Sequence, residues 1–395
     1  NSVLVMNSPL CPFVRGLKVF LHNDLGSTVY RATGRHRVVT TEWMTYEDVG
    51  GNEEAFARLL RDLPAEVAGQ WVFAFQNVSS LVSGFDLAGV AKAAGGKARR
   101  VPVPIEGPRL DEDWLGGYDA VVAGILGRVL DGKGRRTDVV LAGNLFCRNE
   151  ADETANVDEL RRLLAEVGVE RPAILLAGGE LPTTALRPRR VLCMPYAGRR
   201  TEGAFAAASL EVARVGLPVG IGGTVEWLRA AVRALGKGRA AEACIDRELS
   251  ALVPRIQWLV AEHLMGRRAA VVADPHLGRG LVDFLRELGI AVEAWFNTSR
   301  APVEAPGCRV FEQPSTEDFA SFLAGSEVDL VLGSSAFQYL AAERGVPYVE
   351  LGFPSYLTHV LHPKPYLGFG GARCLIESIF HAVLNGDQRR DARRI

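Results

Sequence analysis

Short apolar runs alternate with amphipathic helical patterns along most of this chain, and this alternation is the strongest constraint on its fold. The runs expected to form buried strands are Trp71–Phe75, Ala98–Pro104, Ala120–Gly124, Val139–Asn144, Ala173–Leu176, Val191–Pro195, Ala269–Ala273, Val292–Phe296, Leu330–Gly333 and Tyr348–Gly352. Helices are expected at Asn52–Leu63, Val157–Val167, Thr201–Val215, Thr224–Leu235, Gly280–Leu288, Glu317–Leu323 and Ala372–Leu384. Strands that alternate with helices in this way are typical of doubly wound α/β layers.

The expected strands fall into three groups, which predicts three domains. Irregular stretches at Arg128–Thr137 and Ala240–Arg267 separate the groups, and the second contains a long helical pattern from Glu242 to Leu264. The predicted domains are residues 1–136, 137–240 and 241–395. The predicted fold class is therefore α/β, with three Rossmann-like domains that each hold a parallel sheet flanked by helices.

Composition excludes several classes of protein. The formal net charge of −1 over 395 residues gives no bulk attraction for nucleic acid or for an acidic membrane surface. The six cysteines form no C-x-x-C pair, which argues against a secreted disulfide scaffold and a self-contained zinc or ferredoxin site. We therefore expect a cytoplasmic protein that binds neither nucleic acid nor membrane, and no apolar run is long enough for a membrane span.

One stretch near the C-terminus, Asp329–Ala372, has the order strand, helix, strand and then a long irregular loop. The loop, Gly352–Gly371, carries His359 and His362. In a parallel sheet such a loop follows the carboxyl end of a strand, where ligands are bound in α/β proteins. This loop is therefore a candidate site.

The sequence of this stretch resembles that of the last domain in the nitrogenase component 1 family, most closely in its β-type subunits. The matching segments are Asp329–Ser335, Gly345-Val346-Pro347, Gly352-Phe353-Pro354 and Gly368-Phe369-Gly370-Gly371. Earlier segments resemble the family in the same order: Thr45–Gly51, Asn144 with its following helix, Gly216-Leu217-Pro218, Gly223–Leu228 and Ala273-Asp274-Pro275. The resemblance covers nearly the whole chain.

The resemblance implies an iron–sulfur cluster between two homologous subunits, held by cysteines at three positions of each chain. Cys11 stands at the first position, but Ser27 and Asn77 occupy the second and third, so this chain alone cannot supply three thiolates. Two interpretations remain open: the partner supplies most ligands while Cys11, or an oxygen of Asp24 or Ser27, supplies one; or this chain supplies none. His22, beside the Ser27 turn, is either a hydrogen-bond donor near the cluster or a core histidine.

The two loop histidines also have alternatives. His359 and His362 could ligate a metal, transfer protons or bind substrate, and are taken here as candidate catalytic residues, or they could cap a helix or pair locally. Cys147, Cys193, Cys244, Cys308 and Cys374 are expected to be structural thiols.

The predicted function is that of a β-type subunit in a nitrogenase-like reductase. The resemblance implies a homologous α-type partner and an ATP-dependent iron protein, which delivers electrons through an iron–sulfur cluster shared at the α–β interface. The alternative is a β-type subunit of a scaffold on which the nitrogenase cofactor is assembled, and a third possibility is a homologue that has lost its metal and only binds a partner. Dinitrogen is disfavoured as substrate, whereas a tetrapyrrole, a methylthio-alkane or a cofactor precursor remains open.

Overall fold

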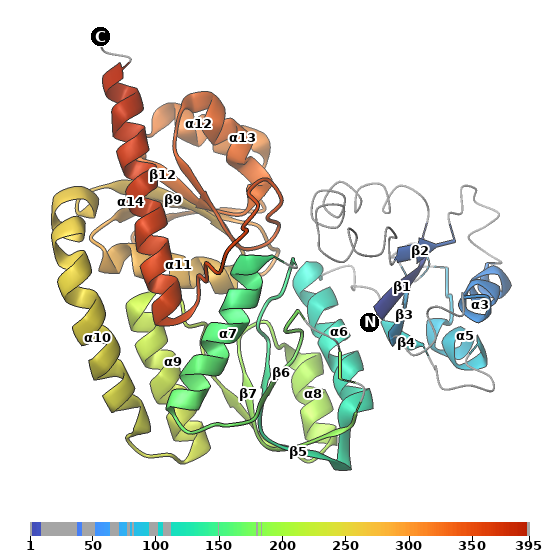
Figure 1. Cartoon of the computed structure of the whole chain (residues 1–395). Coiled ribbons are helices and arrows are strands. Elements are labelled where there is room, and N and C mark those ends of the chain that lie inside the picture. The colour runs from blue at the N-terminus through green and yellow to red at the C-terminus, as the bar shows by residue number, and fades with distance from the viewer. Residues whose placement is uncertain are drawn as a thin grey trace. The chain divides into compact units, whose positions relative to one another are not determined.

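The computed structural model describes residues 2–8, 38–41, 52–63, 71–76, 80, 83–94, 102–105, 112–148, 150–178, 181–182 and 184–392. Three parallel sheets flanked by helices make up this part of the chain (Figure 1), which confirms the predicted fold class. The described residues divide into two compact units. Unit 1 takes those within Asn1–Thr137, Gly178–Arg189 and Tyr196–Val212, and unit 2 takes those within Asp138–Ala177, Arg190–Pro195 and Ala213–Ile395.

Unit 1 contains the first sheet, with strand order β2-β1-β3-β4. Its strands are β1 (Ser2–Asn7), β2 (Val38–Thr40), β3 (Trp71–Gln76) and β4 (Val103–Ile105), and its helices are α3 (Glu53–Arg61), α5 (Leu87–Ala94), α6 (Trp114–Val129) and α8 (Arg199–Ala207). Alternate residues of β1 are buried, as expected for a strand with one face on a core. Val5 packs with Ala74 of β3 and Phe56 of α3 in one hydrophobic cluster.

The second sheet has the strand order β6-β5-β7-β8. Its strands are β5 (Leu130–Ala142), β6 (Pro172–Ile174), β7 (Leu186–Cys193) and β8 (Val212–Arg214). Because the unit boundaries fall at Thr137 and Arg189, the chain passes from one unit to the other inside both β5 and β7. Neither unit is therefore a continuous segment of the sequence.

The third sheet, β11-β10-β9-β12-β13, lies wholly in unit 2. Its strands are β9 (Arg268–Ala273), β10 (Ala291–Asn297), β11 (Arg309–Glu312), β12 (Leu330–Gly333) and β13 (Tyr348–Glu350). The helices of unit 2 are α7 (Ala151–Glu166), α9 (Gly220–Leu235), α10 (Ala240–Leu259), α11 (Pro275–Glu287), α12 (Thr316–Gly325), α13 (Gln338–Arg344) and α14 (Gly368–Ala392), with a 3₁₀ turn at Ser335–Phe337 (η4) and a π-helical turn at Val260–Leu264 (η3).

Local sequence explains where several of these helices begin and end. Asp274 caps α11 by accepting hydrogen bonds from the backbone N–H groups of His276 and Leu277, and Pro275 fits the first helical turn. Ser315 and Asp318 form a reciprocal capping box at the start of α12. Helix α9 ends at Gly236, whose φ of 66° is the left-handed conformation that glycine adopts without strain.

The long C-terminal helix α14 closes unit 2. It packs against α7, α9 and α10 and also contacts β12 and β13, and Figure 1 shows it (red) running alongside α7 (green). Its buried residues, including Phe369, Ala372 and Ile379, join the hydrophobic cluster that also contains residues of the second and third sheets. This shared cluster makes those two sheets parts of one core.

Three predicted elements are wrong. The apolar run Ala120–Gly124 lies inside α6, where Val122, Ile125 and Val129 are buried at helical rather than alternating spacing. The stretch taken as irregular, Arg128–Thr137, contains the start of β5. The single helix expected over Thr201–Val215 is instead the end of α8, a turn and the strand β8.

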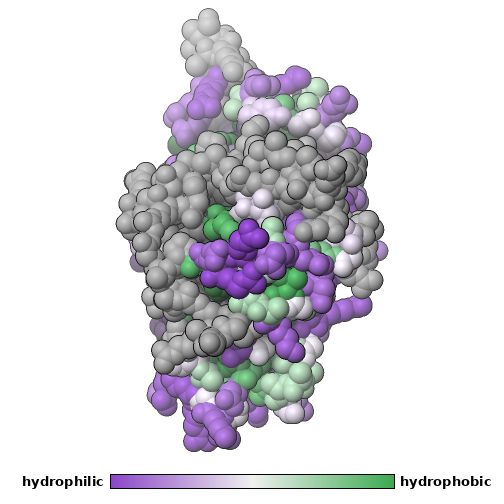
Figure 2. All heavy atoms as spheres, turned by 90° about the vertical axis from the view of Figure 1, so that its right-hand side faces the viewer, coloured by the Kyte–Doolittle hydropathy of each residue, from purple (hydrophilic) through white to green (hydrophobic). Residues whose placement is uncertain are grey.

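The described surface is mixed in polarity. In the view of Figure 2, hydrophilic residues dominate the centre of the face, and hydrophobic residues form small areas beside them. The large hydrophobic side chains recorded as exposed are Val253, Trp258, Met265, Tyr339, Leu357 and Leu361. Among the helices described, none combines the length and apolar character that a membrane crossing requires.

Candidate functional site

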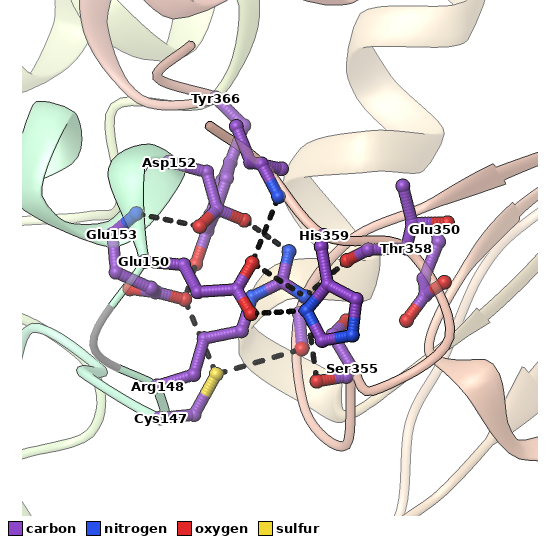
Figure 3. Close-up of polar contacts among 12 residues, drawn as sticks. Cys147, Arg148, Glu150, Asp152, Glu153, Glu350, Ser355, Thr358, His359 and Tyr366 are labelled. Carbon is purple, nitrogen blue, oxygen red and sulfur yellow. Dashed lines mark hydrogen bonds and ion pairs between the residues drawn. The ribbon is translucent and has the colours of Figure 1, made fainter. Parts of the chain in front are cut away.

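The loop Gly352–Gly371, which the sequence singles out, is attached to the N-terminal half of α7 by a set of polar side chains (Figure 3). Helix α7 begins shortly after β5, at the carboxyl edge of the second sheet. The loop follows β13, at the carboxyl edge of the third sheet. The site is therefore built from segments of unit 2 that follow the carboxyl ends of strands in the second and third sheets.

A buried arginine forms the centre of this attachment. The side chain of Arg148 is 1% exposed and its guanidinium contacts the Asp152 carboxylate at 2.5 Å. It also donates to the backbone carbonyl of Thr358 at 2.7 Å, and the carbonyl of Ser355 lies at 3.5 Å. Burial favours the neutral guanidine, but the carboxylates of Asp152 and Glu150 outweigh this effect and raise the pKa of Arg148. A buried charge that is paired and hydrogen-bonded in this way holds the loop backbone in one position.

Glu150, the residue just before α7, makes a second attachment. One carboxylate oxygen accepts a hydrogen bond from the backbone N–H of Val360 at 2.8 Å. The other lies 2.7 Å from Nδ1 of His359. The backbone N–H of Ala151 in turn donates to the carbonyl of Val360. The start of α7 and this part of the loop are thus joined by reciprocal hydrogen bonds.

Glu153 is a buried carboxyl group in the first turn of α7. Its Oε1 accepts hydrogen bonds from the phenol of Tyr366 at 2.9 Å and from the thiol of Cys147 at 3.2 Å, while Oε2 has no hydrogen-bond partner among the described residues. Burial, together with the neighbouring Asp152 carboxylate, raises the pKa of Glu153 to about 8. The Glu153 side chain is accordingly a neutral carboxylic acid at pH 7.

The same environment keeps Cys147 as a thiol. Burial and the adjacent Glu153 raise its pKa well above the ordinary value of a cysteine. Because a metal ligand must be a thiolate, this cysteine is held in the form least suited to bind a metal. Its single S–H has two acceptors within reach, Oε1 of Glu153 at 3.2 Å and the carbonyl oxygen of Gly352 at 3.6 Å.

The end of the loop is held further along α7. Oδ1 of Asn156 accepts from the backbone N–H groups of Tyr366 and Leu367, at 2.8 and 3.0 Å. Glu159 accepts from the N–H of Gly370 at 3.0 Å. Asp152, Asn156 and Glu159 are spaced four and three residues apart, which places them on one face of the helix. That face binds the loop along its length.

Two features of the loop point outward from these attachments. His359 is half exposed even though Nδ1 contacts Glu150, and His362 is exposed. Leu361, between them, is 91% exposed, and Leu357 is 47% exposed. Exposed leucines on a backbone fixed by buried charges present an apolar surface at little further cost in conformational entropy.

A cavity of about 310 Å³ lies on another side of the loop, between it, β13 and α14. Its lining combines carboxylates with basic side chains, including Asp152, Glu350, Lys364 and His381. Lys364, which lies between two prolines, therefore faces a cavity within unit 2. The candidate catalytic histidines are not among the residues that line this cavity.

The segment predicted to hold the cluster ligands lies outside the part of the chain that the structure describes. Cys11, His22, Asp24 and Ser27 all lie outside the described residues. Their assignment as cluster residues stays a prediction from the sequence.

What is described next to that segment is the carboxyl edge of the first sheet, which ends in amides and hydroxyls. Asn7 and Asn52 exchange two hydrogen bonds, at 3.2 and 2.9 Å, and Thr41 donates to Asn7 at 3.1 Å. Gln76, at the end of β3, is buried, and its Oε1 has no hydrogen-bond partner among the described residues.

The other cysteines of the described residues are buried or partly buried. Cys193 and Cys244 are buried in β7 and α10, and Cys308 and Cys374 are partly buried before β11 and in α14. Within the described ranges, no group of three or more His, Cys, Asp and Glu side chains is arranged to hold a metal ion.

The residues that attach the loop were missed by sequence reasoning. A signal for them exists in the sequence: acidic and amide side chains recur on one face of a helix that is expected to be covered by other elements. Buried polar residues at helical spacing imply a polar partner, and here the partner is the loop backbone.

Comparison with known proteins gives one family. The family model described as nitrogenase component 1 type oxidoreductase matches residues 22–384. A nitrogenase molybdenum-iron protein beta chain from Bradyrhizobium diazoefficiens is 26% identical over 308 residues, which is 68% of this chain and 59% of that protein. The corresponding beta chain from Nostoc sp. is 24% identical, with 75% of this chain and 63% of that protein covered. This chain thus spans less than two thirds of the length of these two relatives.

Comparison with solved structures supports the fold. A structure described as nitrogenase Cp1 at pH 6.5 superimposes with a TM-score of 0.81 and 16% identity, and the match covers 98% of this chain and 90% of the other. A second, described as nitrogenase Cp1 at pH 5, gives a TM-score of 0.69 and 14% identity. At this level of identity the likeness concerns the arrangement of the backbone.

Proposed function

Because the chain belongs to the family of nitrogenase component 1 type oxidoreductases, on its β-chain side, we propose that it is the β-type subunit of a nitrogenase-like reductase complex. It would pair with a homologous α-type subunit and take part in electron transfer from an ATP-dependent iron protein. The observation that carries this proposal is the family match over residues 22–384, which includes the loop and its attachments to α7.

The described residues do not fit an iron–sulfur cluster. Clusters of this kind are held by thiolates, but Cys147 is kept protonated by its surroundings, and the edge of the first sheet offers amides and hydroxyls. We therefore derive no chemical step through a cluster from this part of the chain. At the positions where the family places cysteines, only Cys11 offers a thiol, so the α-type subunit would supply most ligands of a shared cluster.

The role that the described residues support is to form a fixed wall of a pocket shared with the partner. The ion pair of Arg148 with Asp152 and the hydrogen bonds of Glu150 fix the loop backbone against the start of α7. The exposed side chains of the loop therefore keep their positions. We propose that His359 and His362 face the α-type subunit and exchange protons with a substrate held there. Leu361, at 91% exposure, would be covered by that subunit.

Assembly of a nitrogenase cofactor on this complex is the second candidate function. The serine and asparagine at two cluster positions favour it, because a scaffold has no need of a permanent cluster on this chain. The two functions differ in outcome. A reductase consumes electrons continuously when the iron protein and ATP are present, whereas a scaffold releases a metal cluster once to an acceptor protein.

The decisive experiment is to purify this chain with its α-type subunit and to measure iron content and ATP-dependent electron consumption. We expect iron in the complex, and a partial loss of it on Cys11→Ala. Cys308→Ala is the matched control, because Cys308 lies in a partly buried turn before β11, where burial raises its pKa to about 11.

Three results would count against these assignments. A complex without iron contradicts both the reductase and the scaffold. Unchanged iron in the Cys11→Ala variant removes that residue from the ligand set. If the complex transfers iron to an acceptor protein and does not consume electrons continuously, the reductase is excluded and the scaffold function holds.

A further inference from the structure

The cavity beside the loop Gly352–Gly371 lies along an edge of the third sheet. Strand β13 is the last strand of that sheet, so it has a neighbouring strand, β12, on one side only. Four consecutive residues, Tyr348–Leu351, line the cavity. Because successive side chains of a strand point to opposite faces of a sheet, four residues in a row share one wall through their backbone edge. The cavity, of about 310 Å³, therefore runs along backbone groups of β13.

The pairing of β13 with β12 leaves backbone groups free on this edge. The N–H of Leu351 donates to the carbonyl of Gly333 in β12. In a parallel pair, residues that bond to the neighbouring strand alternate with residues whose N–H and C=O groups point away from it. The backbone groups of Tyr348 and Glu350 therefore point away from β12, and the described part of the chain gives them no hydrogen-bond partner. This edge can bind a further amide group.

Lys364 brings a positive charge to the same cavity. It lies between Pro363 and Pro365, whose rings restrict the loop backbone on both sides. Lys364 is partly buried, and among the described residues its ammonium has neither a hydrogen bond nor an ion pair. Burial raises the pKa of the Cys374 thiol and the charge of Lys364 opposes this effect, which indicates that the ammonium lies near the α14 wall of the cavity. A partly buried cation of this kind is stabilised by an anion.

The two carboxylates in the lining are held by the chain itself. Asp152 pairs with the buried guanidinium of Arg148. Oε1 of Glu350 accepts a hydrogen bond from the hydroxyl of Ser335, and Oε2 of Glu350 is buried. Lys364 has no such partner within the described chain, so the lining favours a negatively charged ligand.

The remaining wall of the cavity is largely apolar. Two of its residues, Leu375 and Ala382, are seven positions apart and therefore lie on the same face of α14. The other apolar residues of the lining are Val349, Leu351, Val360 and Pro365. An apolar wall with a few fixed polar groups is typical of a small-molecule site.

We propose that this cavity, the β13 cavity, binds a small carboxylic acid that carries an amide and a branched apolar group, as an N-acylated amino acid does. The carboxylate pairs with Lys364. The amide bonds to the outward backbone groups of β13, in the way that an added strand binds a sheet edge. The apolar group packs against Leu375 and Ala382, where it leaves water. This binding does not depend on the electron-transfer role proposed above.

The test uses three matched probes and isothermal titration calorimetry of the full chain. N-acetylleucine carries all three groups, N-acetylleucinamide lacks the negative charge, and isocaproate lacks the amide. We expect N-acetylleucine to bind, and each of the other two to bind about tenfold or more weakly. The proposal is overturned if N-acetylleucine does not bind, or if either of the other probes binds as tightly.

Variants locate the binding in the β13 cavity. Lys364→Met should abolish the preference for N-acetylleucine over its amide, whereas Lys364→Arg should keep the affinity within about threefold. Ala382→Phe should fill part of the cavity and weaken the binding of N-acetylleucine about tenfold or more.

Lys133→Met is the matched control, because Lys133 is an exposed lysine of β5 and does not line the cavity. Its affinity for N-acetylleucine should equal that of the unchanged chain. Thermal unfolding without a probe establishes that each variant is folded. A folded Lys364→Met variant that still prefers N-acetylleucine over its amide would place the binding elsewhere and overturn the assignment.

Discussion

At the scale of single residues, Glu153 makes the attachment of the loop depend on pH. Its pKa of about 8 in the folded chain lies above the ordinary value of a glutamate, mainly because the carboxyl is buried. Below the ordinary pKa both folded and unfolded states are protonated, and the group has no effect. Between that value and about 8 only the unfolded state loses its proton, so the free energy of unfolding falls as pH rises.

Glu153→Gln should remove this dependence. Glutamine keeps the oxygen that accepts from Tyr366 and Cys147, and it cannot ionise. We expect the variant to be more stable than the original chain at pH 8, by on the order of 4 kcal/mol, and the difference to vanish near pH 4. Thermal unfolding of both proteins between pH 4 and pH 9 measures the difference in stability at each pH.

Glu262→Gln in η3 is a suitable control, since it removes the same kind of ionisable carboxyl at an exposed position. A difference between Glu153→Gln and the original chain that stays constant across this pH range would contradict a neutral Glu153.

The sequence indicates which parts of the candidate site are exposed and not which are buried. His359 and His362 stand out because imidazoles in a long loop after a strand suggest chemistry. Glu153 does not stand out, because acidic residues in the first turn of a helix are ordinary partners of the helix dipole. Its raised pKa comes mainly from burial. Part of what surrounds it, Tyr366, lies more than two hundred residues further along the chain, so no local pattern encodes this environment.

At the scale of elements, α6 and α8 are joined through one carboxylate. Asp119 of α6 accepts hydrogen bonds from the backbone N–H groups of Gly198, Arg200 and Thr201, at 2.8, 2.9 and 3.0 Å, where α8 begins. Its carboxylate serves as the N-terminal cap that α8 does not supply from its own sequence.

Asp119→Ala should leave these N–H groups without an acceptor and lower the free energy of unfolding by about 2–4 kcal/mol. Asp119→Asn, which keeps one oxygen, should lose less than half of that amount. Urea denaturation gives the magnitude, and amide hydrogen exchange at Gly198–Thr201 locates the effect. Equal stability of the alanine variant and the original chain would show that solvent replaces the cap.

Gly333 allows β12 to pass close to β9. Its φ is 139°, and a Cβ atom there would lie 1.9 Å from the carbonyl oxygen of Val272. Gly333→Ala should therefore destabilise the third sheet by more than about 3 kcal/mol.

Gly127→Ala is the matched control for this substitution. Gly127 lies in α6, and a Cβ atom added there would meet nothing within 4 Å, so alanine should be neutral or stabilising by up to about 1 kcal/mol. If the Gly333→Ala and Gly127→Ala variants had the same melting temperature, the close approach of β12 and β9 would be contradicted.

Sequence patterns predict the third sheet well and the elements around the first unit boundary poorly. The strands β9, β10 and β12 are largely buried apolar runs between helices, which leaves one interpretation. The run Ala120–Gly124 is apolar in a helix that is also largely buried, and a short apolar run cannot distinguish the two cases. The first half of β5 is exposed and polar, so it lacks a strand pattern altogether.

At the scale of the whole chain, the family match and the loss of cysteines at two expected cluster positions suggest that the proposed α-type subunit would hold most of a shared cluster. The fold is complete enough to superimpose on a solved nitrogenase chain over 98% of its length. At the positions where the sequence resemblance implies cluster cysteines, this chain has Cys11, Ser27 and Asn77. Under the proposed function, this chain would contribute shape and surfaces to a complex, and its chemistry would depend on the α-type subunit.

The passage of the chain between its two units, inside β5 and β7, has a consequence for biosynthesis. Unit 1 takes its last segment from Tyr196–Val212, so its helix α8 has not yet been synthesised when the strands β1 to β4 leave the ribosome. Domains usually fold as they are synthesised, from the N-terminus onward. Here the earliest segments of unit 1 wait until more than half of this sequence has been synthesised, and during that interval their apolar strands are available to chaperones.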